Sequence, residues 1–451
     1  MQLDAFLEKL FGAADQAGFE DYEAYYSRDD QFEVSVFEGE IDDYTVSGTL
    51  ALSFRGRLSG CMGYASTQVL DDEAVTMLVD GARQNALIIE SDDPQFIFEG
   101  SARYPELALY DERLDKTSAL ERIELAKALE RDALELDQRV RQMQACTVFT
   151  ASGFTRIVNS KGLDVSSKTG LAGGYISPVV REAERTQTAA AYTFGRELSV
   201  IDTRKLASDA VEEALDALTA SPVPSGKYRV ALRGDAAASL LAAFGGVFSA
   251  ERAQKSLSLL KDREGEVIAS QAVTLLDDPH HLTAPNSTPF DAEGVATYRK
   301  PVVERGVLTT LLHNLKTAAK QGVTTTANAS KASVASPVDI SASNFFFEPS
   351  GLSADKLLVK LGEGLLITEL NGLHSGADAI SGDFSLAARG YKVEGGKRSQ
   401  AVDQITLAGN FYELLRDVVL VANDLKFGFP GSACYGSPTI LISQLSVAGQ
   451  E

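Results

Sequence analysis

Apolar residues recur at helical spacing in several stretches of the first half of the chain. In the first of these, Phe6 and Leu10 fall on one face together with neighbouring leucines. Apolar residues three and four positions apart are typical of a helix with one buried side. This spacing predicts helices over Leu3–Ala17, Asp72–Leu87, Asp115–Leu136 and from Asp202 to about Ala220.

Between these helices, apolar and polar residues alternate over short stretches, which is the pattern of half-buried strands. Glycine-containing segments predict hairpin turns at Glu38–Glu40, Arg55–Arg57 and Asn159–Gly162. The predicted strands are Tyr22–Tyr26, Phe32–Phe37, Thr49–Phe54, Leu58–Ala65, Val140–Ala151, Phe154–Asn159, Leu163–Ala172 and Thr186–Phe194.

The segment Ser221–Gly226 contains two prolines between serines and glycine, which favours a linker over a helix or strand. We therefore expect two domains, residues 1–220 and 227–451. The second half is mostly strand-like, with predicted helices at Ala236–Phe244, Ser353–Leu361 and Phe411–Val421. Its predicted strands are Tyr228–Leu232, Val267–Leu275, Thr297–Pro301, Gly306–Leu312, Leu365–Glu369, Phe384–Glu394, Ser399–Leu407 and Thr439–Ser443. The fold class is α+β, with a mixed or antiparallel sheet in the first domain.

Composition narrows the class of protein. The chain has 451 residues, of which 44% are hydrophobic, and its net charge is −21. No apolar run approaches the roughly 20 residues of a membrane span, and because no basic stretch precedes an apolar run at the start, we expect no secretory signal. Three widely spaced cysteines favour a reducing compartment, so we expect a cytoplasmic protein. The acidic charge argues against direct binding of nucleic acid, because phosphates require clustered Lys and Arg.

Candidate catalytic residues are few. Of the four histidines, His280 and His281 follow Asp277-Asp278-Pro279, and we interpret this run as a surface turn rather than a metal site. His313 follows a strand-like run and is expected to be packed or half-exposed. The segment Gly390–Lys397 has the wrong spacing for a phosphate-binding loop, and its Glu394–Lys397 portion is expected to form a hairpin turn. Cys434 has no neighbouring base, so a buried structural cysteine is expected.

An ordered set of motifs resembles the TldD/PmbA family, and specifically its PmbA (TldE) branch, once described as modulators of DNA gyrase. The strongest motif is Asn371–Gly376 followed by Ser381–Ser385, Gly390 and Glu394. The others are Phe37–Ile41, Ser47-Gly48, Ser256–Lys261, Gly265–Val267, Leu276–Pro279, Phe290–Val295, Val303–Leu308, Ile405–Asn410 and Ser446–Gly449. Together they span nearly the whole chain in the expected order.

The resemblance implies an N-terminal α+β domain, a β-rich, barrel-like C-terminal domain with peripheral helices, and a dimer that encloses a cavity. TldD-type members resemble metallopeptidases with a His-Glu-x-x-x-His helix. The matching helix here, Ala236–Ala250, contains no His, Glu, Asp or Cys. It cannot hold zinc, since zinc requires such ligands. We therefore expect no metal, no cofactor and no catalytic residue in this chain.

Three hypotheses follow. In the first, the chain is the non-catalytic subunit of a cytosolic two-subunit metallopeptidase, paired with a TldD-type subunit and holding peptide substrate. In the second, it is a stand-alone homodimeric peptide-binding or scaffold protein. In the third, Cys434 and His374 form an unannounced active site. Substrate or partner contact is assigned to one glycine-rich loop, whose alternative role is a sharp turn between core strands. Its residues are Asn371, His374, Ser375, Gly376, Ser381, Gly382 and Asp383.

Overall fold

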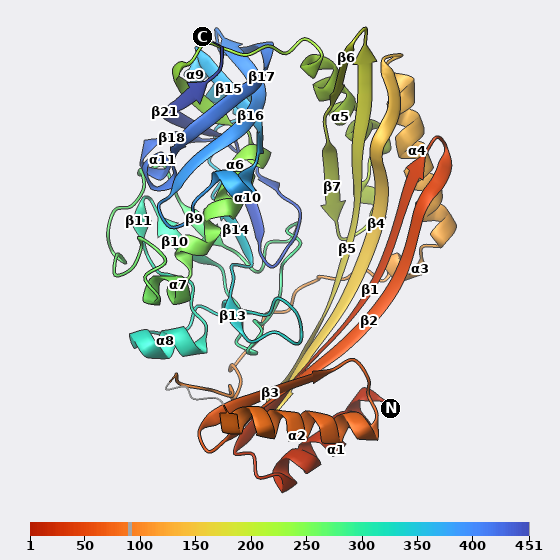
Figure 1. Ribbon diagram of the computed structural model, residues 1–451, viewed down its shortest axis with the longest axis vertical. Coiled ribbons are helices and arrows are strands. Elements are labelled where there is room, and N and C mark those ends of the chain that lie inside the picture. The colour runs from red at the N-terminus through yellow and green to blue at the C-terminus, as the bar shows by residue number, and fades with distance from the viewer. Residues whose placement is uncertain (89–92, 451) are drawn as a thin grey trace.

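The computed structural model describes residues 1–88 and 93–450, and its N-terminal half is built on one long antiparallel sheet (Figure 1). The strand order within the described residues is β3-β2-β1-β4-β5-β6, with β7 beside β5. The longest strands have 17 to 20 residues, well beyond the usual length. The bounds are β1 Asp21–Phe37, β2 Glu40–Leu58, β3 Cys61–Thr67, β4 Val140–Asn159, β5 Asp164–Glu182, β6 Arg185–Thr188 and β7 Ala191–Gly195.

The helices of this half cover only one face of the sheet (Figure 1). Side chains alternate between the two faces of a strand, so the even-numbered residues of β1 share a face. Tyr22 and Tyr26 pack under α1 and α2, while Phe32 and Val34 pack under α4 and α5. The helices are α1 Leu3–Gln16, α2 Asp72–Ile88, α3 Arg113–Lys116, α4 Ala119–Leu136 and α5 Thr203–Ala217. The opposite face, which we call the inner face, is turned toward the C-terminal half.

The C-terminal half contains a barrel and a second, smaller sheet. β17 pairs with both β16 and β21, which closes β8, β15, β16, β17 and β21 into a barrel with β18 attached. The smaller sheet has the order β11-β10-β9-β14-β20-β19, and β12 pairs with β13. The strands are β8 Gly226–Leu232, β9 Leu275–Asp277, β10 Lys300–Glu304, β11 Val307–Leu308, β12 Ala329–Ser330, β13 Asp339–Ile340, β14 Asn344–Phe347, β15 Gly364–Asn371, β16 Asp383–Glu394, β17 Lys397–Asn410, β18 Val418–Val421, β19 Lys426–Phe427, β20 Cys434–Ser437 and β21 Ile440–Ala448.

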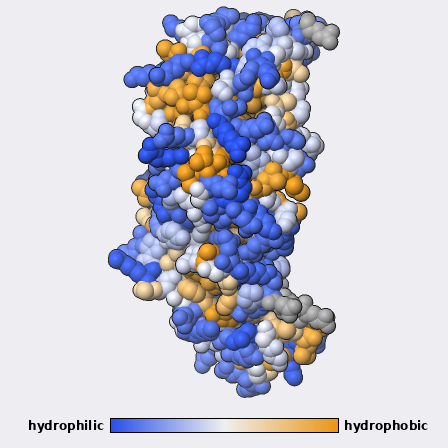
Figure 2. Space-filling model, turned by 90° about the vertical axis from the view of Figure 1, so that its left-hand side faces the viewer, coloured by the Kyte–Doolittle hydropathy of each residue, from blue (hydrophilic) through white to orange (hydrophobic). Residues whose placement is uncertain are grey.

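The helices of the C-terminal half lie around and between these sheets. They are α6 Gly234–Phe244, α7 Ala250–Gln254, α8 Leu315–Gln321, α9 Ala354–Leu361, α10 Leu373–Gly376 and α11 Phe411–Asp417. α6 packs against β15 of the barrel and β20 of the smaller sheet, so one apolar core extends through both. Figure 2 shows that the outer surface of this half carries separate apolar patches surrounded by hydrophilic residues.

The predicted α+β class and barrel-like C-terminal half are confirmed, but several predicted strands were fragments of longer ones. Tyr22–Tyr26 and Phe32–Phe37 both belong to β1, and the two predicted strands between Val140 and Asn159 form β4. The turn predicted at Arg55–Arg57 is wrong, because Arg55 stays in β2 and pairs with Glu23. The chain turns instead at Ser59 and Gly60, whose φ angles of 53° and 81° suit a tight hairpin.

In the C-terminal half, the predicted strand Val267–Leu275 is mostly irregular, since β9 begins only at Leu275. The helix predicted over Phe411–Val421 ends at Asp417 and continues as β18. The turn predicted at Glu394–Lys397 is confirmed by the pairing of these two residues across a hairpin. The segment Ser221–Gly226 connects α5 to β8, and the domain boundary placed there stays a prediction.

Two further features concern the surface. No helix among residues 1–88 and 93–450 combines the length and apolar character needed to cross a membrane. In the same residues, β2 pairs with β3 only from Leu52 to Leu58, so the stretch Glu40–Ala51 has β1 on one side and a free edge on the other.

Candidate functional site

Polar and charged side chains gather on the inner face of the sheet where it meets the C-terminal half. Glu23 and Tyr25 of β1 point to this face because Tyr22, Ala24 and Tyr26 are buried on the other. Arg55 of β2 lies directly opposite Glu23 in the register. The Arg55 guanidinium contacts the Glu23 carboxylate at 2.8 Å and the carboxylate of Glu293, from the C-terminal half, at 3.9 Å.

All three members of this ion cluster are buried, with exposed side-chain fractions of 8% or less. Glu293 also accepts a hydrogen bond from the backbone N–H of Leu315, at the start of α8. Burial raises the pKa of Glu23 and of Glu293, while the Arg55 charge opposes that rise. The cluster therefore links the sheet to the C-terminal half through charges that have left water, and each depends on its partners.

Asp291, two residues before Glu293, organises the adjoining loop. One carboxylate oxygen accepts the N–H groups of Glu293 and Val295, and the other accepts the N–H of Ala329 in β12. Burial, followed by the nearby charge of Glu293, raises the pKa of Asp291 to about 7, although the three N–H donors favour the charged form. Among the described residues, no cationic side chain lies within 4.0 Å of this carboxylate.

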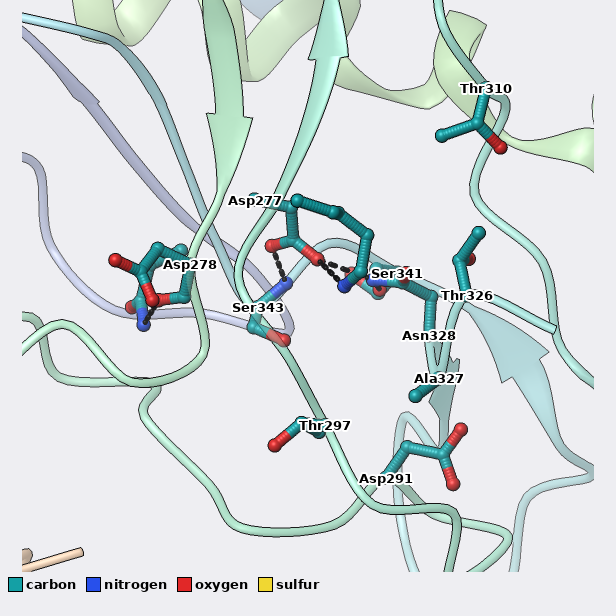
Figure 3. Close-up of polar contacts among 12 residues, drawn as sticks. Asp277, Asp278, Asp291, Thr297, Thr310, Thr326, Ala327, Asn328, Ser341 and Ser343 are labelled. Carbon is teal, nitrogen blue, oxygen red and sulfur yellow. Dashed lines mark hydrogen bonds and ion pairs between the residues drawn. The ribbon is translucent and has the colours of Figure 1, made fainter. Parts of the chain in front are cut away.

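Asp277, on β9, forms a second buried polar centre (Figure 3). Its carboxylate accepts hydrogen bonds from Lys300 Nζ at 2.9 Å, from Asn328 Nδ2 at 2.7 Å and from the Ser343 N–H at 2.8 Å. Asn328 Nδ2 donates a further hydrogen bond to the Ser341 carbonyl. These two acceptors fix the orientation of the amide. Asn328 Oδ1 is thereby left buried without a hydrogen-bond partner.

A cavity of about 420 Å³ lies between the inner face of the sheet and these loops. Hydroxyl and amide groups dominate its lining, with Lys331 and Asp291 as its charged residues. Burial, and then the Arg55 charge, lower the pKa of Lys331 to about 8. The lining comprises Tyr25, Thr155, Ser167, Thr169, Pro285–Thr288, Phe290–Ala292, Ala327–Lys331, Ser341–Ser343, Gly431 and Ser432.

The loop predicted to contact substrate or partner forms the connection between β15 and β16, away from this lining. α10 occupies its first part, and Asp383 Oδ1 accepts a hydrogen bond from Asn410 Nδ2 at 2.8 Å. A side chain at Gly382, whose φ is 86°, would meet the ring of Tyr412. His374 is exposed. The loop is thus a well-braced turn, and its contact role stays a prediction.

The helix predicted to match the family's metal helix is shorter than expected. α6 ends at Phe244, and a 3₁₀ turn over Gly245–Phe248 separates it from α7. Two consecutive glycines favour this break, and a Cβ at Gly245 would meet the Tyr435 ring at 2.3 Å. The buried side chains of α6 are apolar: Ala236, Ala237, Ala238, Leu240, Leu241 and Phe244.

These side chains do not fit a zinc ion, which requires nitrogen, sulfur or oxygen ligands. No group of three or more His, Cys, Asp or Glu side chains with metal-binding geometry occurs in residues 1–88 and 93–450. No chemical step through a metal is therefore assigned to this chain.

The structure does not support the pairing of Cys434 with His374. The Cys434 thiol is fully buried and lies 3.5 Å from the Gly428 carbonyl, whereas His374 is exposed on α10. Burial raises the pKa of Cys434 to about 12, so the thiol stays protonated and unreactive at neutral pH. The expectation of a buried structural cysteine is consistent with this environment.

The chain turns at Pro279 and His280 as predicted, but residues 277–281 do not form the surface turn that was expected, because much of the run is buried. Asp277 is fully buried, Asp278 is nearly so, and the His281 ring packs edge-on against Phe346 and Phe427. The two carboxylates face hydrogen-bond donors of the protein rather than water. The pattern of polar residues in the sequence does not reveal this burial. His313 is packed as expected, with an exposed fraction of 1%.

The fold and sequence define a class of protein. Residues 22–86, 112–218 and 225–449 match the family models for domain 1, the central domain and the C-terminal domain of the PmbA/TldA metallopeptidases. The chain belongs to this PmbA/TldD family.

Individual relatives extend this assignment along the chain. Metalloprotease PmbA of Escherichia coli O157:H7 is 28% identical over 98% of this chain and 94% of its own length. A Thermotoga maritima protein, whose suggested role is modulation of a DNA gyrase, is 34% identical, with a TM-score of 0.91 over 99% of this chain and 100% of its own. TldE from Thermococcus kodakarensis shares the fold, with a TM-score of 0.90 at 23% identity over 98% of this chain and 100% of its own.

Proposed function

We propose that this chain is a TldE-like, non-catalytic subunit that completes a cytosolic metallopeptidase by holding peptide substrate beside a metal-bearing TldD-type subunit. The observation that carries the proposal is α6. At the place where the family's metal helix is expected, the chain keeps a helix but fills it with buried alanine, leucine and phenylalanine. A protein that is similar to metallopeptidases over its full length, yet offers no zinc ligands there, is suited to a supporting role.

The inner face of the sheet supports the second part of the proposal. An extended peptide needs a surface rich in hydrogen-bonding groups, because each of its residues brings one N–H and one C=O. The lining of the cavity offers hydroxyl and amide groups from both halves of the chain. The three cysteines are all free, and two of them are buried, which suits a reducing compartment such as the cytosol.

Reconstitution tests the proposal. The chain is purified alone and together with a metal-bearing TldD-type homologue from the same organism, and hydrolysis of an unstructured peptide is measured. We expect cleavage only in the mixture and its loss on chelation. Stoichiometric zinc in the purified chain, or chelator-sensitive cleavage by the chain alone, would overturn the proposal. A stable homodimer that neither binds nor stimulates the homologue would favour the stand-alone scaffold.

A further inference from the structure

We propose that the free edge of β2 binds an extended peptide segment and that Arg122, in a cavity beside this edge, holds a carboxylate at the end of the segment. The site lies on the outer face of the sheet, which is the face that the helices cover. It is distinct from the cavity at the inner face, so the inference does not depend on the proposed subunit role. Three features carry it: an uncovered stretch of sheet, a guanidinium without a carboxylate partner, and an unpaired strand edge.

The helices leave part of the outer face uncovered. α1 and α2 lie at one end of the sheet, and α4 lies toward the other (Figure 1). Between them a cavity of about 470 Å³ lies over β1, β2 and β4, with Arg28 and Asp30 in its lining. Gly48 of β2 contributes no side chain, and a Cβ there would meet the Asp30 carboxylate at 2.9 Å. The volume is that of a small-ligand site.

Arg122, at the start of α4, is the residue that gives this cavity its chemical preference. Its Nη2 donates to the Leu114 carbonyl at 2.7 Å, and its guanidinium carbon lies 4.7 Å from the centre of the Phe32 ring. These two contacts hold the guanidinium in place. Nε is enclosed by the protein. Nη1, in contrast, has no hydrogen-bond partner among the described residues and is not cut off from solvent, so a ligand in the cavity can reach it.

The surrounding charges do not compensate Arg122. In the part of the chain that the structure describes, no carboxylate oxygen lies within 4.0 Å of its guanidinium. Asp115, in the same lining, contacts Lys168 at 3.2 Å, and Glu121 accepts the N–H of Ser118 at 2.7 Å. Burial lowers the pKa of Arg122, although nearby acidic groups oppose this change. A ligand carboxylate would supply the missing anion, because it accepts charge-assisted hydrogen bonds from a guanidinium.

The unpaired edge of β2 borders the same cavity. Val46–Gly48 belong to the lining, and among the described residues this part of β2 has only β1 as a neighbour. The Phe32 ring lies beneath Arg122 and 5.3 Å from the ring of Tyr44 on the edge strand. The free N–H and C=O groups of such an edge can pair with an added strand. A segment that pairs here and ends at the cavity brings its last carboxylate to Arg122.

The charges along the edge set the direction of the segment. From Val46–Gly48, the longer part of the free edge runs back to Glu40. Glu40, Asp42 and Asp43 are exposed there, so that end favours a cation, whereas Arg122 favours an anion. A segment parallel to β2 satisfies both ends when it begins with a basic residue and finishes with a carboxylate.

The side chains of the edge strand indicate the pattern of the segment. Tyr44 and Val46 pair with core residues of β1 on the outer face, yet they are 45% and 65% exposed. Thr45 and Ser47 point to the opposite face. A neighbouring strand with alternating apolar and polar residues matches this arrangement, and β-branched residues favour the extended conformation.

Fluorescence polarisation with the purified chain at pH 7.5 tests this inference. The probe is the dye-labelled peptide Lys-Thr-Val-Thr-Val-Thr-Val in three forms: with a free terminal carboxylate, with a terminal amide, and with a terminal amide and glutamate as the last residue. We expect the free carboxylate form to bind about 10-fold more tightly than the amide, because the amide loses a hydrogen bond to a charged group.

The glutamate form identifies the source of the carboxylate. Tight binding of this form shows that a side-chain carboxylate suffices, and weak binding assigns the site to a chain terminus. Equal affinities of all three forms, or no binding of any, would overturn the inference. A dimer in gel filtration that excludes the probe would also overturn it, since a second copy would then occupy the edge.

Two pairs of variants locate the binding. Arg122→Gln is expected to lower the affinity of the carboxylate form to that of the amide, and Arg131→Gln, exposed on the same helix, is the matched control. Asp42→Lys is expected to weaken binding of all forms several-fold, with the exposed Asp355→Lys as its control. Thermal unfolding of each variant confirms that it is folded. A preference for the carboxylate form that survives Arg122→Gln would overturn the location.

These outcomes are separable from those of the reconstitution. Binding is measured on the chain alone, so it does not depend on a TldD-type partner. If the mixture cleaves peptides but the probe does not bind, the edge assignment fails and the subunit role stands. If the probe binds but the mixture is inactive, the subunit role fails.

Discussion

Along α6 the buried side chains are alanine, leucine and phenylalanine, whereas the buried side chains that line the cavity at the inner face include Asn328 and Asp291. Both regions lie in the C-terminal half. The buried apolar side chains of α6 are stabilised by packing alone and need no ligand. The cavity lining keeps an acceptor unpaired and a carboxylate without a cation. The side chains of α6 thus contribute to stability, whereas the cavity lining keeps buried polar groups although their burial costs free energy.

The largest expected effect is on the packing side of this comparison. Phe244 is fully buried, and its ring stacks on that of Phe411 with centroids 4.6 Å apart. Phe244→Ala removes these contacts and leaves a cavity, so we expect a loss of about 3–5 kcal/mol in the free energy of unfolding, measured in urea. Val359→Ala, at an exposed position of α9, is the control. A loss below about 1 kcal/mol would show that α6 is not a packing element.

The next effect concerns the Asp277 centre. Lys300→Met removes the cation from a carboxylate that is fully buried, and we expect a loss of about 3 kcal/mol in the free energy of unfolding. The double variant with Asp277→Asn removes both charges and is expected to recover part of this loss. If the two single losses simply add in the double variant, the ion pair is not a coupled unit.

A smaller effect distinguishes Asp291 from the other acids by its pH dependence. Its pKa is raised, so the folded state keeps a proton that the unfolded chain loses above about pH 4. This contribution to stability is complete below about pH 4 and is lost as the pH rises toward 7. Asp291→Asn is expected to remove this decline, which is on the order of 2 kcal/mol between pH 4 and 7. The exposed Asp355→Asn is the control, and an unchanged decline in Asp291→Asn would assign it to another group.

The smallest expected effect on stability is at the loop predicted from the sequence. His374 is exposed, so His374→Ala is expected to change the free energy of unfolding by less than about 0.5 kcal/mol. If the loop contacts a partner, the variant lowers peptide cleavage in the reconstituted mixture. Unchanged cleavage would leave the loop as a turn between strands.

The sequence predicted those elements in which apolar residues recur with a regular period. The helices were found because each buries one regular stripe, as in α1 with Phe6 and Leu10. The long strands were divided wherever residues such as Ser27–Gln31 of β1 leave the core, since hydrogen bonding to neighbouring strands continues there without any apolar signal. Arg55 was placed in a turn for a similar reason, because its burial depends on Glu23 and Glu293, which are distant in sequence.

The cavity was missed because its residues come from segments without a repeat. Asp291, Asn328, Ser341 and Ser343 lie at strand ends or in loops, and their spacing along the chain carries no period. The motif Phe290–Val295 supported the family resemblance but gave no indication that Asp291 would be buried. Adjacent acids such as Asp277-Asp278 need donors where they are buried, but the sequence alone does not show that they are buried.

The free edge of β2 has a consequence for the protein in concentrated solution. An unpaired strand edge is a template on which another chain can add a strand, and such edges promote aggregation unless charges protect them. Here Glu40, Asp42 and Asp43 are exposed at one end of that edge, and the side chains of Tyr44 and Val46 beside them are also exposed. At neutral pH the carboxylates repel a second copy. Colloidal stability at this edge therefore depends on charge, because the unpaired hydrogen-bonding groups of the backbone offer no protection there.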